Sequence, residues 1–136
     1  MATYTKFQPF IEAVMEGKHD FSSDQLVVAL TNAANPPAAT DGVLGDLTEI
    51  AYTNLSSRNI TTSSSSQTGG TYSLVLADLV LTASGNVAAF QYVVVYNDDA
   101  ATDELIAFFD YGSEISLVSG ETFTIDFNAS GLFTAS

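Results

Sequence analysis

The sequence contains no cysteine and only one histidine, His19, among its 136 residues. Without cysteine the chain forms no disulfides and no thiolate metal sites. Cysteine usage therefore does not indicate whether the protein works in an oxidising or a reducing compartment. One histidine is too few for a multi-histidine metal site within a single chain. Metal and redox chemistry built on cysteine or on several histidines is therefore excluded.

Positive charge is also scarce. Lys6, Lys18 and Arg58 stand against sixteen acidic residues, which gives a formal net charge of -13. These three residues form no patch that would neutralise phosphates, so the composition argues against nucleic acid and anionic membranes as partners. Only 14% of residues are charged while 46% are hydrophobic. A polar but mostly uncharged surface suits a protein that packs against copies of itself or against a partner.

Long apolar runs are missing as well. No run approaches the roughly 20 residues that a membrane helix needs. The first residues, 1–4, lack the apolar core of a signal peptide. We therefore expect a soluble chain that is made and used without secretion.

Apolar residues alternate with a period of two across residues 72–127, which predicts β-strands with one face toward a core. Short turn-forming segments at residues 84–86, 97–99, 111–113, 119–120 and 130–131 separate the runs. The pattern predicts a mainly β fold: an antiparallel β-sandwich, jelly-roll or immunoglobulin-like, with one short N-terminal helix. The length favours one domain over residues 9–136, preceded by an arm or first short strand at residues 1–8. The expected core-facing sets are Phe90, Tyr92, Val94 and Tyr96; Leu105, Ala107 and Phe109; and Phe123, Ile125 and Phe127.

Several local features refine this picture. A helix is expected to begin near Pro9 and to stop at Gly17, with its apolar side covering one end of the sandwich. Residues 25–31 are apolar on both faces, which predicts an interior strand. The register slips near residues 77–78, where a β-bulge would leave Asp78 outside and return Leu79 and Leu81 to the core. Turns at residues 119–120 and 130–131 predict two tight hairpins at the C-terminus.

An acidic segment offers the best candidate for an ion site. Asp98, Asp99 and Asp103 lie in or beside a turn and carry the oxygen ligands that calcium prefers. Aspartate also fills turns for backbone reasons alone, so a solvated hairpin loop is the simpler interpretation. Residues 126–131 match the first half of an EF-hand loop, but the glutamate required at its twelfth position would lie beyond Ser136.

Catalytic motifs are not evident. His19 precedes Asp20, but adjacent residues seldom face each other, and no serine motif accompanies the pair. Paired carboxylates for glycoside hydrolysis are possible on composition, yet no pattern singles out two of them. We therefore expect no enzymatic activity, no cofactor and no resident metal.

Short strings that are spread over nearly the whole chain form one pattern: Phe7, Phe10, Ile11, Val14 and Gly17-Lys18-His19, and residues 23–32, 65–78, 92–98, 105–112 and 120–127. Together they resemble small structural proteins encoded in the virion gene clusters of tailed bacteriophages. The resemblance over the whole chain is more persuasive than any one of these strings.

The resemblance implies a virion component, most plausibly a decoration or cement protein that binds the major capsid protein on the outer shell. It implies a protein made in the host cytoplasm and assembled as a homo-oligomer, and it supplies no catalytic motif. The alternative is a tail or fibre module that binds a receptor or glycan, which would predict an exposed aromatic patch. Under the first interpretation, we expect two segments to contact the partner: the N-terminal arm at residues 1–8 and the loop at residues 32–45, which contains two prolines. The expected contact residues are Tyr4, Lys6, Phe7, Pro36 and Pro37.

Overall fold

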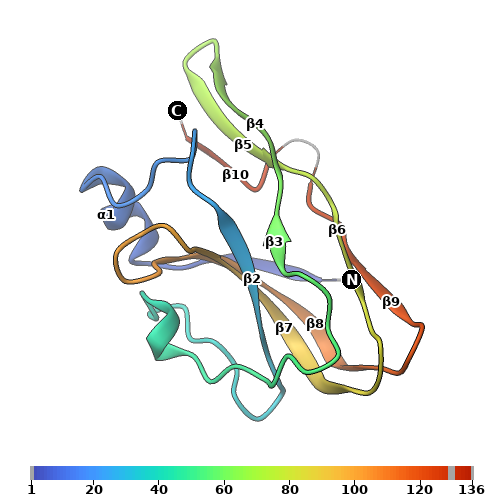
Figure 1. Cartoon of the computed structure of the whole chain (residues 1–136). Coiled ribbons are helices and arrows are strands. Elements are labelled where there is room, and N and C mark those ends of the chain that lie inside the picture. Colours follow the sequence, from blue (N-terminus) through green and yellow to red (C-terminus); the bar gives the residue numbers. More distant parts are fainter. Residues whose placement is uncertain (1, 129–130, 136) are drawn as a thin grey trace.

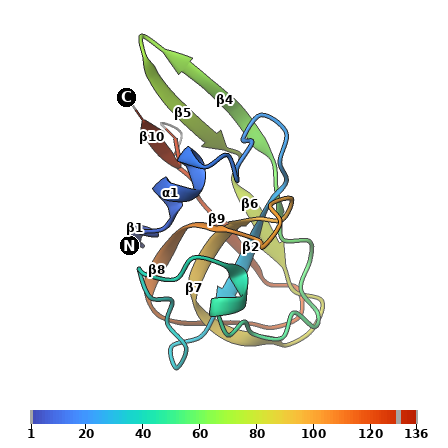
Figure 2. The same ribbon diagram turned by 90° about the vertical axis from the view of Figure 1, so that its left-hand side faces the viewer.

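The computed structural model describes residues 2–128 and 131–135 (Figures 1 and 2). The described residues form a mainly β, antiparallel fold with one short α-helix, which confirms the predicted fold class. The elements are β1 (Thr3–Lys6), α1 (Phe10–Met15), β2 (Leu26–Thr31), the 3-10 turn η1 (Leu44–Asp46), β3 (Asn59–Ile60), β4 (Thr62–Thr68), β5 (Thr71–Leu76), β6 (Leu79–Thr82), β7 (Val87–Asn97), β8 (Leu105–Leu117), β9 (Thr122–Ile125) and β10 (Phe133–Ala135).

One layer is a five-stranded sheet in the order β1-β8-β7-β2-β3. Strand β7 lies at its centre, and Val93, Val94 and Val95 are completely buried although they alternate between the two faces. All six residues of β2 are buried, and β2 pairs with β7 on one side and β3 on the other. The interior position predicted for residues 25–31 is therefore confirmed, because both faces of this strand are covered.

The second layer consists of a three-stranded sheet, β10-β5-β4, and a two-stranded sheet, β6-β9. One run of chain links them, and it breaks at Ala77-Asp78 between β5 and β6. Asp78 is exposed there, and its carboxylate accepts a 2.9 Å hydrogen bond from the backbone N–H of Phe127. Leu81 is fully buried and Leu79 packs against the core. The predicted change of register at residues 77–78 is present, but it is a break between two strands with different partners and not a β-bulge within one strand.

The two layers meet in an aromatic and aliphatic core. Phe90 of β7 packs edge-on against Phe123 of β9, with ring centroids 5.4 Å apart. Tyr92 instead contacts Phe108, whose ring also packs on Phe7. The β7–β8 register shifts between Phe90 and Tyr92. The prediction that Phe90 and Tyr92 share a face is therefore wrong, because the irregularity turns Phe90 toward the second layer.

Helix α1 lies beside one end of the molecule (Figure 2). Phe10 and Ala13 are buried, whereas Ile11 is 48% exposed and Met15 is 78% exposed. The helix stops as predicted at Gly17, whose N–H donates to the carbonyl of Val14. The expected apolar side of this helix is thus only partly used for packing.

The C-terminal hairpins predicted from turn signals are not formed in the described residues. Strand β9 pairs with β6, and β10 pairs with β5. The turn at Ser119-Gly120 exists, but it leads the chain from one layer to the other. Strand β8 also continues through Tyr111-Gly112-Ser113, where the sequence predicts a turn, although its register with β7 shifts there. Gly112 adopts a φ of 81°, which a glycine tolerates inside an irregular strand without leaving the sheet.

The N-terminal residues form the first short strand of the sheet. Residues 3–6 pair in register with β8, from Thr3 opposite Asp110 to Lys6 opposite Ala107. Of the two interpretations of residues 1–8, the structure shows the strand for residues 3–6. The next residue, Phe7, is 1% exposed and belongs to the core.

Candidate functional site

The residues predicted to contact a partner are divided between surface and core. Tyr4 is 40% exposed, and Lys6 and Pro36 are also exposed. Phe7 and Pro37 are buried, so we correct their assignment: neither side chain presents a contact surface. Phe7 is buried because β1 brings it against Phe108, with ring centroids 5.0 Å apart. The five residues therefore do not form one contact patch.

The acidic segment after β7 is organised by a buried asparagine. Asn97 is completely buried, and its side-chain oxygen accepts hydrogen bonds from the N–H groups of Asp99 and Ala100. Its amide nitrogen donates to the Asp24 carboxylate over 2.7 Å and lies 3.0 Å from His19 Nδ1. The Asn97 side chain therefore fixes the turn from within, as expected for an asparagine that caps a loop.

Two carboxylates of this segment hold the loop through separate hydrogen bonds. Asp99 accepts the backbone N–H of Gln25 over 2.7 Å, and buried Glu104 accepts the hydroxyl of Thr102. Burial, followed by the charges of Asp98, Glu104 and Glu49, raises the pKa of Asp103. Within residues 2–128 and 131–135, no three acidic, histidine or cysteine side chains gather in a way that could hold a metal ion. The calcium candidate at Asp98, Asp99 and Asp103 therefore gains no support.

His19 is packed into the protein more closely than a loop histidine usually is. Its ring stacks on Phe21 at 5.0 Å with an interplanar angle of 11° and lies 5.4 Å from Phe10. Burial lowers the pKa of His19, while the charges of Glu104 and Asp24 act in the opposite direction. Asp20 is exposed and accepts hydrogen bonds from the backbone and hydroxyl of Ser22, so its carboxylate organises the turn that follows.

The partial EF-hand match at residues 126–131 falls partly outside the described residues, because 129 and 130 are not among them. The N–H of Gly131 donates to the carbonyl of Asn128 over 3.0 Å, in the segment between β9 and β10. No helix flanks this segment in the described part of the chain. The segment thus connects two strands of the second layer.

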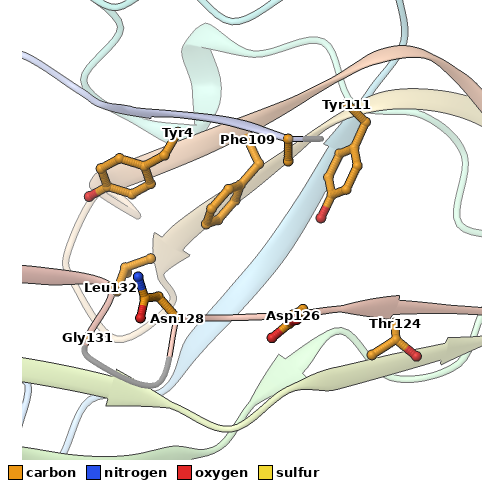
Figure 3. Close-up of a pocket in the computed structure, with 9 residues that line it drawn as sticks. Tyr4, Phe109, Tyr111, Thr124, Asp126, Asn128, Gly131 and Leu132 are labelled. Carbon is orange, nitrogen blue, oxygen red and sulfur yellow. The ribbon is translucent and has the colours of Figure 1, made fainter.

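One concave feature is a groove of about 620 Å³ where the two layers open beside β1 and β9 (Figure 3). We call it the aromatic groove. One wall carries Tyr4 of β1 and Phe109 and Tyr111 of β8, and the facing wall carries polar side chains from β9 and the residues after it (Figure 3). Its lining comprises Ala2, Tyr4, Phe109, Tyr111, Thr124, Asp126, Asn128, Gly131 and Leu132.

The aromatic wall is held in place by ring contacts with the core. Tyr4 and Phe109 lie 5.5 Å apart, and Phe109 packs edge-on against Phe127 at 6.1 Å. Tyr111 packs edge-on against Phe123 at 5.2 Å. Because Phe109 and Tyr111 each pack against another ring, this part of the wall is pre-formed, as small-ligand sites usually are.

The electrostatics of the aromatic groove are set by its tyrosines and one carboxylate. Burial raises the pKa of Tyr4 to about 12. Burial, and then the negative charge of Asp126, raises the pKa of Tyr111. Both hydroxyls therefore stay protonated at neutral pH, and Asp126 is close enough to Tyr111 for its charge to act on the hydroxyl.

The sequence predicts Tyr4 as a contact residue, which stays a prediction, and does not predict the rest of the aromatic groove. Its spacing places Phe109 in the core, and its turn signals place Tyr111 in a turn. A signal was present: Thr124, Asp126 and Asn128 alternate with the core residues of β9 and its extension, so they had to face outward. Which residues lie opposite that face depends on the pairing of β1 with β8, and no local sequence pattern predicts that pairing.

A second surface feature is the hairpin formed by β4 and β5, which projects from the body of the molecule (Figures 1 and 2). Its strands remain paired up to Thr68 opposite Thr71. Gly69 and Gly70 both adopt positive φ, as a two-residue turn of type I′ requires. Residues 59–77 contain no charged side chain, although the chain as a whole carries a net charge of -13. We call residues 62–76 the projecting hairpin.

Comparison with protein-family models, with curated proteins and with solved structures found no match to this chain. In the portion of the chain that the structure describes, no helix is long and apolar enough to cross a membrane. Any functional assignment therefore depends on the sequence resemblance and on the geometry of the two surface features.

Proposed function

We propose that this chain is a non-enzymatic structural protein of a tailed-phage virion, which binds the major capsid protein on the outer face of the shell and stabilises it. The resemblance described above supports this role. We further propose that the chain acts as a homo-oligomer and needs neither nucleic acid nor a membrane as a partner.

The observation that carries the proposal is the projecting hairpin. Strand β4 is an edge strand, and its side chains are serine, threonine and glutamine. Monomeric proteins usually protect such an edge with charges, proline or a bulge within the strand. Strand β4 has neither charge nor proline, and its one irregularity lies at its base, between Thr62 and Ser64. An edge of this kind is suited to contact with another protein.

The position of the charges adds a second argument. Two surfaces that both carry strong negative charge repel each other. The projecting hairpin is free of charge and stands away from the acidic body, so copies can meet a lattice or one another there at little electrostatic cost. Because a shell presents many identical sites, a modest affinity per copy is sufficient for stable attachment of linked copies.

Quantitative mass spectrometry of purified virions tests this function. A copy number comparable to that of the major capsid protein supports a decoration role. A matched pair of variants then locates the contact: Ser64→Glu with Ser66→Glu on the exposed face of β4, and Ser113→Glu with Ser116→Glu, also exposed, on β8 as the control. We expect the β4 pair to lower occupancy on the shell and the β8 pair to leave it unchanged. Equal occupancy of both would remove the projecting hairpin from the contact.

The aromatic groove favours a second candidate, a tail or fibre module that binds a receptor or glycan. Exposed aromatic rings facing polar side chains are the kind of surface on which sugars stack. A copy number of only a few per particle would support this candidate and contradict the capsid role.

A further inference from the structure

The aromatic groove has a volume within the range of small-ligand sites, and its two walls differ in chemistry. Aromatic rings from β1 and β8 form one wall, while a carboxylate, an amide and a hydroxyl from Asp126, Asn128 and Thr124 belong to the other. Figure 3 shows Tyr111 directed from the aromatic wall toward the strand that carries Asp126. A ligand that fits must therefore have an apolar or flat face together with a polar group.

The charge in the aromatic groove is negative and is not offset by its own lining. Asp126 is exposed, and Lys6, Lys18 and Arg58 are not among the lining residues. These are the only lysine and arginine residues of the chain. The carboxylate therefore faces the groove without a basic neighbour in its lining, in a molecule whose overall field already attracts cations.

Rings and a carboxylate together match an organic cation better than a neutral ligand. The face of a tyrosine or phenylalanine ring attracts a cation within about 6 Å of its centre. A guanidinium group is planar, stacks on such a ring and pairs with a carboxylate through parallel hydrogen bonds. A neutral sugar would also use the rings, but it would gain nothing from the net charge.

We propose that the aromatic groove binds a guanidinium or alkylammonium group, namely an arginine or lysine side chain that the partner protein presents. This inference rests on the proposed function, because it names what the partner contributes to the contact. The partner would then be held at two places that differ in chemistry. In the aromatic groove, a cationic group of the partner meets rings and a carboxylate, whereas the contact at the projecting hairpin is uncharged.

Nuclear magnetic resonance titration of the isolated, isotope-labelled chain tests the proposal. The probe is arginine blocked at both ends, and blocked citrulline provides a neutral probe of nearly the same shape. We expect saturable shifts at Tyr4, Phe109, Tyr111 and residues 124–128 with the arginine probe, weaker at higher salt, and little response to citrulline.

Three variants assign the effect to particular groups. Asp126→Asn should weaken binding of the arginine probe by about three- to fivefold, the effect expected for an exposed ion pair. Glu16→Gln makes the same charge change at an exposed site on α1 and should leave binding nearly unchanged. Tyr111→Phe keeps the ring and should retain binding, whereas Tyr111→Ala should weaken it.

Methyl glucoside serves as a sugar probe in the same titration. The proposal is overturned if citrulline binds as well as arginine, if Asp126→Asn has no more effect than Glu16→Gln, or if the resonances of the groove residues shift only with methyl glucoside. The last result would favour the glycan-binding candidate. Failure of the proposed function is a separate result: arginine binding in solution with no copies on the shell would retain the groove assignment and remove the capsid role. Shell binding without arginine binding would do the reverse.

Discussion

Replacing Phe7 with alanine separates the two roles that the N-terminal segment was given, a contact arm and a part of the core. Phe7 is 1% exposed, packs on Phe108 and anchors β1 through its N–H, which donates to the carbonyl of Ile106 over 3.1 Å. Truncating a buried phenylalanine removes its transfer free energy and leaves a cavity, which together cost about 3–5 kcal/mol. That is a large share of the roughly 5–15 kcal/mol by which domains are stable.

The measurement is urea unfolding followed by circular dichroism, with Tyr4→Ala as the matched control. Tyr4 is 40% exposed and packs on Phe109, so its truncation should cost about 1–2 kcal/mol, less than that of the fully buried Phe7. The reasoning is refuted if Phe7→Ala lowers the free energy of unfolding by no more than Tyr4→Ala does. Loss of shell binding with unchanged stability in Phe7→Ala would return Phe7 to the contact surface.

Three further predictions follow from the buried polar network, from His19 and from the projecting hairpin. Asn97→Ala should lower the free energy of unfolding by about 2–4 kcal/mol, since several partners lose a buried hydrogen bond; a urea midpoint unchanged from the parent would contradict this. Because burial lowers the pKa of His19 in the folded state, its protonation favours unfolding. Stability should therefore be unaffected by His19 above pH 6.5 and fall as the pH drops below it, and His19→Phe should reduce that fall; parallel stability curves for parent and variant would refute the argument. Ser64→Glu with Ser66→Glu should leave the free energy of unfolding within about 0.5 kcal/mol of the parent, because both side chains are exposed; a larger loss would show that β4 is needed for folding and would disqualify the pair as a test of binding.

The sequence predicted what depends on local pattern. The continuous apolar run within residues 25–31 identified β2 as an interior strand, because a strand with two covered faces is apolar on both. The slip near Asp78 was also visible: a carboxylate in the buried register signals that the register changes there.

Strand partners were beyond this kind of reasoning. Turn signals at residues 119–120 suggested a hairpin, yet β9 crosses to β6, since pairing is decided by which edges meet in the assembled sandwich. Gly112 was taken for a turn, although its positive φ is accommodated inside β8. The irregularity between Phe90 and Tyr92 places their side chains on different faces of the sheet, and no residue type in this segment signals the change.

The candidate site was only partly predictable for a related physical reason. Tyr4 and Asp126 are far apart in the chain and reach one groove only through the pairing of β1 with β8 and of β9 with β6. The acidic segment at residues 98–104 is the stronger candidate for a site on sequence pattern alone. In the structure, its Asp99 and Glu104 side chains hold the turn through hydrogen bonds. Local spacing identified polar residues correctly and did not show which of them share a cavity.

The most direct test of the central claim is cryo-electron microscopy of purified virions that contain this chain. The account predicts density with the shape of this β-sandwich at regular lattice positions on the outer shell, with the projecting hairpin touching a neighbouring subunit. A bare shell, with the chain found only along or at the tip of the tail, would contradict the capsid role and leave the receptor-binding candidate in its place.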